Sequence, residues 1–454
     1  MSNKLTTRSS NLAYDLILRG GTVVNHEGMG IRDIAVKAGR IACLGDLGMV
    51  SSKKVINCKG LHILPGVIDS QVHFREPGLE HKENLQTGSR AAVAGGVTTV
   101  FDMPNTAPPT TNEKQLVDKL SRAHHRMFCD FAFYIGGTSE NIDNIPELEK
   151  IEGSAGIKVF MGSSTGSLLL DDKVELDYLI SRLGRRAAFH AEDETRLVMR
   201  QHIKRVGDSS SHPEWRDSRS ALIATERLVQ LAEKHKRRVH ILHISTGDEM
   251  DYLRAHRQWV TAEVTPNHLT FSAPDCYREL GTYVQMNPPV RNAEHQKRIW
   301  QAVVDGTVDV LGSDHAPHTR EEKGRVYPDS YSGMPGVQTL VPIMLDHVNS
   351  GRLSLARFVD LTSHGPQRVF GITSKGRIAI GYDADFTVVD LKRQKTITDS
   401  WIESKCGWTP YNGVTVTGWP VGTFVRGHLA MWEGEILLPA RGESVRFQEG
   451  GLLR

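Results

Sequence analysis

The sequence predicts an α/β protein: a (β/α)₈ barrel of the TIM type with a composite β-sandwich domain formed from both ends of the chain. Two observations support this prediction. Between residues 67 and 366, short apolar strands alternate with amphipathic helical segments. On both sides of that region, the pattern changes to short strands separated by glycines. The resulting boundaries are 14–66 and 367–440 for the composite β domain, 67–366 for the barrel, and 1–13 and 441–454 for the tails.

Repeated strand and helix segments predict the barrel. After a first strand that ends at Asp69, the predicted strands are Val97–Asp102, Cys129–Tyr134, Gly156–Phe160, Arg186–His190, Val239–His243, Val260–Val264 and Val308–Ser313. Their apolar residues run continuously, which is typical of parallel strands buried on both faces. Helical patterns lie between them at Asn84–Ala94, Glu113–Ala123, Leu176–Arg182, Ser220–Lys234 and Ala293–Val304. Seven or eight such units favour a closed barrel over the alternative, a doubly wound open sheet, because no glycine-rich phosphate turn follows the first strand.

Both chain ends carry the pattern of a small β domain. Near the N-terminus, Tyr14–Arg19 precedes a Gly20-Gly21 turn and further short strands. Near the C-terminus, Gly376–Asp390 is a turn followed by a strand, and Val421–Val425 is another strand. Because such patterns flank the barrel on both sides, we expect the two ends to build one sandwich.

Composition gives no reason to expect nucleic-acid or membrane binding. The chain has 454 residues, 39% hydrophobic and 24% charged, with a formal net charge of +2. No segment approaches the roughly 18 consecutive apolar residues of a membrane span, and no apolar export signal follows Lys4 and Arg8. Five dispersed cysteines without CxxC spacing fit free thiols in a reducing compartment. We therefore expect a cytoplasmic location.

Polar side chains gather where the predicted barrel strands end. They are His73, Arg75, Asp102, Asn105, Lys158, His190, His243, Asp314 and His318. In barrels of this type, the active site lies at the C-terminal ends of the strands. We therefore expect these side chains to meet on one rim.

Five of them have the side chains of a metal site: His73, Lys158, His190, His243 and Asp314. Taken alone, a histidine at a strand end is more often a hydrogen-bonded structural group, and an aspartate there fits a turn cap. Taken together, three imidazoles and a carboxylate on one rim match the ligands of zinc, and an open coordination position suits hydrolysis.

Lys158 lies in an otherwise apolar strand. An ammonium there, close to a dication, is disfavoured by desolvation and by repulsion. Reaction with CO₂ would give a carbamate whose two oxygens could bridge two cations about 3.5–4 Å apart. The alternative is a lysine that points outward or extends to a surface carboxylate.

These residues lie in motifs that resemble the dihydroorotases of the amidohydrolase superfamily and, more loosely, the hydantoinases and allantoinases. The motifs cover nearly the whole chain and are Leu64–Asp69, His73–Gly78, Asp102–Thr106, Lys158–Gly166, His190–Glu192, Leu242–Ser245, Met286–Arg291 and Ser313–His318. The segment from Gly376 to Asp390 is similar to the β domain of that superfamily.

The resemblance implies a zinc-dependent hydrolase that interconverts N-carbamoyl-L-aspartate and L-dihydroorotate in pyrimidine biosynthesis. It implies one or two Zn²⁺ ions per chain, a bridging carbamate on Lys158, and Asp314 as the group that accepts and returns the proton. The residues that it implies for substrate binding are Arg75, Asn105 and His318 for the carboxylate and Asn287 for the ring amide. A forked cation such as Arg75 suits the carboxylate, which hydantoin and allantoin lack.

The chain departs from the family pattern at Gln71, where most members carry a second histidine in His-x-His. An amide oxygen is a much poorer zinc ligand than imidazole. This departure predicts one tightly held zinc in place of two.

Two other functions remain open from the sequence. The chain could hydrolyse hydantoin or allantoin, or it could be an inactive homologue that scaffolds aspartate transcarbamoylase, an idea motivated by Gln71. Retention of the other site residues argues against inactivity. We expect a small-molecule substrate and a homo-oligomer, either a dimer or a tetramer.

Overall fold

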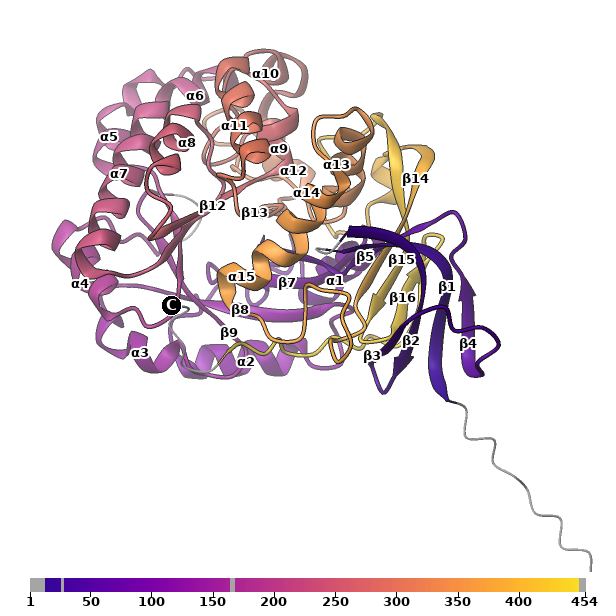
Figure 1. Ribbon diagram of the computed structural model, residues 1–454. Coiled ribbons are helices and arrows are strands. Elements are labelled where there is room, and N and C mark those ends of the chain that lie inside the picture. The colour runs from indigo at the N-terminus through magenta and orange to yellow at the C-terminus, as the bar shows by residue number, and fades with distance from the viewer. Residues whose placement is uncertain (1–12, 26–27, 164–167, 449–454) are drawn as a thin grey trace, which may run out of the picture.

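The computed structural model describes residues 13–25, 28–163 and 168–448, and these form two parts (Figure 1). Eight parallel strands with their helices make the larger part. Nine strands from both chain ends make a sheet domain beside it. The predicted α/β class, with a barrel and a β domain drawn from both ends, is confirmed.

The barrel strands lie side by side in chain order. They are β6 (Val67–Val72), β7 (Val97–Asp102), β8 (Asp130–Gly136), β9 (Ser154–Phe160), β10 (Ala187–His190), β11 (Val239–Ile241), β12 (Val260–Val264) and β13 (Val310–Leu311). Nearly all of their residues are buried, as expected for strands covered on both faces. The first and last strands meet, because the His73 N–H donates to the His315 carbonyl at 2.7 Å and the Ser313 N–H donates to Asp69 at 2.9 Å.

Helices cover the outside of the strands (Figure 1). They are α1 (Leu85–Ala94), α2 (Glu113–Ala123), α3 (Ile145–Leu148), α4 (Lys173–Arg182), α5 (Glu194–Met199), α6 (His212–Trp215), α7 (Ser218–His235), α8 (Gly247–Arg254), α9 (Pro266–Thr270), α10 (Asp275–Leu280), α11 (Ala293–Asp305), α12 (Arg320–Lys323), α13 (Leu340–Asn349), α14 (Leu355–Val359) and α15 (Gly365–Phe370). Side-chain caps fix several starts: Asn84, Asn112 and Asp217 each accept a backbone N–H three residues later.

The sheet domain joins the two ends of the chain. Its strands are β1 (Tyr14–Asn25), β2 (Gly28–Lys37), β3 (Arg40–Gly45), β4 (Ser52–Asn57), β5 (His62–Pro65), β14 (Phe386–Thr396), β15 (Thr415–Val425), β16 (His428–Trp432) and β17 (Glu435–Ile436). β5 pairs with β1 on one side and with β14 on the other, so the expected sandwich is one continuous sheet. Its two halves share one apolar core, in which Leu18 and Ile34 belong to the same cluster as Phe386 and Phe424.

Buried ion pairs tie the sheet domain to the barrel. The Lys375 ammonium lies 2.7 Å from Asp385, at the start of β14, and also pairs with Asp130, the first residue of β8. Residues 441–448, which we expected to belong to a tail, continue this junction, because the Val445 N–H donates to the Phe131 carbonyl at 2.9 Å.

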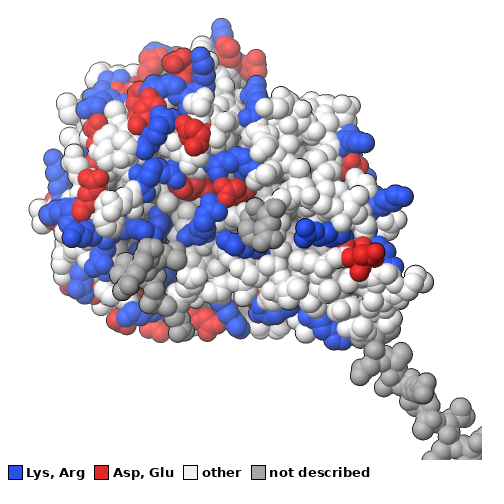
Figure 2. All heavy atoms as spheres, in the orientation of Figure 1, with Lys and Arg blue, Asp and Glu red and all other residues white. Residues whose placement is uncertain are grey.

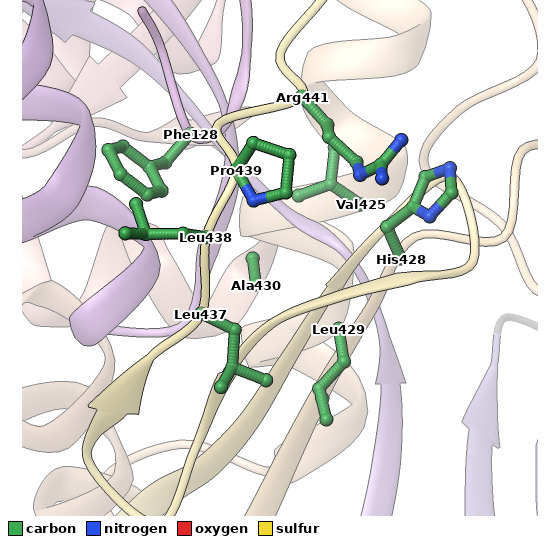
Figure 3. A pocket seen from close by; sticks show the side chains of 9 residues that line it. All are labelled: Phe128, Val425, His428, Leu429, Ala430, Leu437, Leu438, Pro439 and Arg441. Carbon is green, nitrogen blue, oxygen red and sulfur yellow. The ribbon is translucent and has the colours of Figure 1, made fainter.

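A hollow at this junction is lined mainly by residues with apolar side chains (Figure 3). Phe128 lines it from the barrel side, and residues of β15, β16 and segment 437–441 line it from the sheet side. Its titratable side chains are His428 and Arg441. None of the predicted site residues lies there.

The surface mixes both charges. On the face shown in Figure 2, acidic and basic side chains are interspersed over the barrel. Within the described ranges, none of the helices has the length and apolar character needed to cross a bilayer.

Candidate active site

A hollow at the C-terminal ends of the barrel strands collects most of the predicted site residues. Its lining consists of Gln71, His73, Lys158, Phe160, His190, His243, Asn287, Asp314, Ala316, Ser332 and Gly333. All five predicted metal ligands are among them, together with Asn287, which we expected to bind substrate. This is the end of the barrel at which active sites lie.

His73 and Asp314 face each other across the join between the first and last strands. The His73 Nδ1 lies 2.8 Å from the Asn105 Oδ1, which can only accept, so the proton is on Nδ1. The unprotonated Nε2 then lies 3.3 Å from the Asp314 Oδ1. Burial lowers the pKa of His73, which keeps the ring neutral. Two atoms with lone pairs therefore face each other, an arrangement that a cation between them would stabilise.

Gln71 occupies the position of the missing histidine and binds Asp314. Its Nε2 donates to the Asp314 Oδ1 at 3.0 Å. Its Oε1 is buried and has no hydrogen-bond partner among the described residues. Gln71 thus holds the carboxylate with its amide N–H and presents a bare amide oxygen to the interior.

His190 and His243 form a second pair. His190 is the last residue of β10, and His243 lies two residues after the end of β11. The His190 Nδ1 lies 3.1 Å from the His243 Nε2. The His190 Nε2 donates to Glu192 at 2.9 Å, and Arg216 holds that carboxylate in turn. The lone pair of the His190 Nδ1 is therefore directed at His243. Burial lowers the pKa of both histidines, so both rings are neutral.

Lys158 projects from β9 into the same hollow and is 1% exposed. Its Nζ donates to the Val159 carbonyl at 3.0 Å and lies 3.6 Å from the centre of the Phe160 ring. Burial lowers the pKa of this amine well below its ordinary value, although Asp314 and Glu263 oppose the shift. Burial therefore disfavours the charged form of Lys158, and the side chain does not point outward.

Three of the site residues have a left-handed backbone. The φ angles are 64° at Arg75, 38° at His243 and 49° at Asp314. Residues other than glycine adopt this region at a cost of about 1 kcal/mol or more. Such strain is typical of functional sites, because the bend turns each side chain away from its strand and toward the rim.

The residues expected to bind a carboxylate separate into two groups. Arg75 and His318 lie together, with the Arg75 Nη2 3.2 Å from the His318 Nε2. Asn105 is engaged by His73. Asn287 is held by a histidine that sequence analysis did not single out, because the His212 Nε2 lies 2.9 Å from the Asn287 Oδ1.

Several supporting residues were missed from the sequence. Glu192 lies two residues after His190 in the His190–Glu192 motif, and this short spacing is the signal that could have identified it as a partner of His190. Arg216 and His212 gave none, since they act across long sequence separations from loops and short helices. The sequence thus predicted His190 and Asn287 as site residues, but not the side chains that hydrogen-bond to them.

The ligand-type side chains form two pairs and do not form one cluster. In the described part of the chain, no three His, Cys, Asp or Glu side chains come close enough together to hold a metal ion. The pairs His73–Asp314 and His190–His243 line one hollow with Lys158. The groups in the same hollow that could complete a metal site around either pair are the Lys158 side chain and the Gln71 Oε1.

Comparison with known proteins assigns the family. Residues 62–430 match the amidohydrolase family. The dihydroorotase of Methanosarcina mazei is 36% identical over 452 residues, covering 96% of this chain and 98% of the relative. The L-hydantoinase of Paenarthrobacter aurescens is 32% identical and covers 94% of this chain and 96% of the relative.

A solved structure shows the same architecture. The L-hydantoinase (dihydropyrimidinase) from Arthrobacter aurescens superposes with a TM-score of 0.91 at 30% identity, over 95% of this chain and 100% of that chain. The resemblance predicted from the motifs is confirmed by these matches. The barrel, the paired ligand-type side chains at its rim and the near full-length similarity lead to one assignment: this chain belongs to the amidohydrolase family.

Proposed function

We propose that the chain is a dihydroorotase, a hydrolase of cyclic amides that interconverts N-carbamoyl-L-aspartate and L-dihydroorotate in pyrimidine biosynthesis. The observation that carries the proposal is the buried pair Arg75 and His318, whose nitrogens lie 3.2 Å apart. The His318 Nε2 lies next to Gly333, which lines the hollow, although neither Arg75 nor His318 is itself part of that lining. A guanidinium beside an imidazole is a receptor for a carboxylate, which dihydroorotate has and simple hydantoins lack.

The proposed cofactor is zinc, one or two ions per chain. His73 and Asp314 would hold an ion on one side of the hollow, and His190 and His243 on the other. Facing lone pairs in the first pair, and the His190 Nδ1 lone pair directed at His243 in the second, support this assignment. When bound, zinc supplies Lewis acidity toward the amide carbonyl and lowers the pKa of water.

Lys158 is proposed to carry a carbamate. Its nitrogen would attack the carbon of CO₂ and lose one proton to solvent, which leaves a carbamate with one negative charge and two oxygens. Two observations support this step: burial favours the uncharged form of the amine, which is the nucleophilic one, and Lys158 lines the same hollow as both ligand pairs. The carbamate would supply the additional ligand that each pair requires.

The residues of the chain divide the remaining work. Asp314 would take a proton from the attacking water and pass it to the leaving ring nitrogen. Gln71 holds Asp314 by its Oδ1, so the proton can be carried by the other oxygen. The Asn287 Oδ1 is occupied by His212, which leaves its amide N–H groups for the ring amide. In the biosynthetic direction, the same proton transfers run in reverse and water leaves.

A second candidate is hydrolysis of hydantoin-like rings, which the similarity to L-hydantoinases favours. The third hypothesis, an inactive scaffold for aspartate transcarbamoylase, is disfavoured by the intact set of ligand-type residues. The proposal also includes a cytoplasmic homo-oligomer, a dimer or a tetramer, which light scattering of the purified protein would test.

The deciding assay uses purified protein supplied with zinc. We expect it to interconvert carbamoyl-aspartate and dihydroorotate, and to act poorly on hydantoin and allantoin. Preference for hydantoin would support the second candidate. Absence of turnover on every ring, with zinc bound, would support the scaffold hypothesis.

A further inference from the structure

We propose that Lys82 is a positioning residue that keeps the proton of His318 on Nε2, so that Arg75 and His318 together present donors to the substrate carboxylate. The inference rests on the proposed function and extends it to the choice between substrates with and without a carboxylate. Lys82 lies in the loop between β6 and α1 and is 6% exposed.

The Lys82 ammonium is held beside one nitrogen of His318. Its Nζ lies 3.2 Å from the His318 Nδ1, 3.1 Å from the Glu322 Oε1 and 4.2 Å from the centre of the Tyr331 ring. The Tyr331 ring also stacks on the His318 ring, with a centroid distance of 5.0 Å. Lys82 and His318 therefore both pack against Tyr331. An ammonium has donors only, and the carboxylate nearest to Nδ1, the Glu322 Oε2, is 3.7 Å away, whereas the Ser332 carbonyl lies 3.1 Å from Nε2, so the His318 Nδ1 accepts from Lys82. A neutral imidazole then carries its proton on Nε2.

The other nitrogen of His318 faces a second donor. The Nε2 lies 3.1 Å from the Ser332 carbonyl and 3.2 Å from the Arg75 Nη2. Because a guanidinium also has donors only, the close approach of Arg75 and Nε2–H is not a hydrogen bond between them. Nε2–H, which donates to the Ser332 carbonyl, and the Arg75 Nη2 are two donors side by side, and a substrate carboxylate oxygen would accept from Arg75 and replace the Ser332 carbonyl at Nε2–H.

Without Lys82 the opposite tautomer becomes favourable. The Glu322 Oε2 lies 3.7 Å from the His318 Nδ1, too far for a hydrogen bond in the present arrangement. Removal of the ammonium would let Nδ1 carry the proton toward this carboxylate. The Nε2 lone pair would then accept from Arg75 in exchange for the lost hydrogen bond to the Ser332 carbonyl, and both donors would no longer be available to a carboxylate.

The test compares Lys82→Met, which keeps the stem and removes the donor, with Lys82→Arg, which keeps a donor-only cation. Nitrogen-15 NMR of histidine-labelled protein reports the tautomer of His318, whose signals are assigned by their loss in His318→Gln. We expect the Nε2–H form in the wild type and in Lys82→Arg, and the Nδ1–H form or a mixture in Lys82→Met. An Nδ1–H wild type, or identical tautomers in all three, would overturn the proposal.

Kinetics give the second readout, with dihydroorotate and with dihydrouracil, the same ring without the carboxylate. In Lys82→Met, the KM for dihydroorotate should rise about tenfold to a hundredfold, the size expected for a lost charge-assisted hydrogen bond. The KM for dihydrouracil should stay unchanged, and Lys82→Arg should restore most of the binding. An equal change for both rings would assign Lys82 a merely structural role. If the wild type does not turn over dihydroorotate, the proposed function fails, while the NMR measurement still decides the tautomer.

Discussion

Gln71 shows how one residue can change a site without dismantling it. Where most relatives of this type carry histidine, the Gln71 amide donates to Asp314 and its buried Oε1 has no hydrogen-bond partner among the described residues. The carboxylate therefore keeps its position while one imidazole ligand is absent. This makes the His73 side of the hollow the weaker of the two proposed metal positions.

Restoring the histidine should raise the metal content. We expect Gln71→His to increase zinc from about one to about two ions per chain in protein dialysed against buffered zinc, because imidazole replaces a weak amide ligand. Elemental analysis per chain is the measurement, and Gln71→Leu, which offers no ligand, is the control. A wild type that already holds two zinc ions tightly would contradict this interpretation of Gln71.

Among the elements, the sequence predicted where the strands of the site lie more accurately than it predicted the residues at which they end. β7 lies where the alternation of strands and helices predicted it, at Val97–Asp102. β11 and β13 are shorter than predicted: His243 and Asp314 adopt left-handed backbones beyond their ends, and β13 also begins two residues later than predicted, at Val310. A pattern of apolar residues reflects burial in a strand, but a left-handed bend at a site residue leaves no such pattern in the sequence.

The α8 helix carries a buried acid whose ionisation is linked to folding. Glu249 closes a capping box with Thr246 at the start of α8. Burial raises its pKa from the ordinary 4.5 to about 7. Between these two values the folded protein binds more protons than the unfolded chain, so the free energy of unfolding falls as pH rises through this window. Above about pH 7 the contribution of this group is constant.

Glu249→Gln should therefore flatten the pH dependence of stability. We expect urea denaturation to show that the free energy of unfolding of the wild type, taken relative to that of Glu249→Gln, falls by an amount on the order of 1–3 kcal/mol between about pH 4.5 and pH 7, since all other titrating groups are shared. Glu147→Gln, at a side chain that is 80% exposed, should keep the wild-type slope. Identical slopes in the wild type and Glu249→Gln would show that Glu249 is already ionised at low pH.

For the whole molecule, the junction between the barrel and the sheet domain depends on buried charges. We propose that residues 67–366 form the barrel unit and that 14–66 with 367–440 form the sheet unit. Lys375 neutralises Asp130 of the barrel and both Asp383 and Asp385 of the sheet domain. No sequence pattern could predict this cluster, because Asp130 and Lys375 are separated by 245 positions and each is ordinary in its own segment.

Removing the central cation should loosen this junction. Lys375→Met should lower the free energy of unfolding by about 3–5 kcal/mol, because it removes the cation that pairs with the buried Asp385 and leaves Asp130 paired with Arg426 alone. Lys150→Met, at a lysine that is 66% exposed, should change it by less than about 0.5 kcal/mol. Chemical denaturation of the three proteins at neutral pH measures both effects. Equal stability of Lys375→Met and the wild type would show that the cluster does not hold the two units together.

The whole account depends on recognition of the substrate carboxylate by Arg75 beside His318. The most direct test is the ratio of kcat/KM for dihydroorotate to kcat/KM for dihydrouracil, measured in the wild type and in Arg75→Ala. The account predicts that the wild type favours dihydroorotate and that the substitution lowers the ratio on the order of a hundredfold, with dihydrouracil turnover retained. A ratio that is the same in both proteins would contradict it.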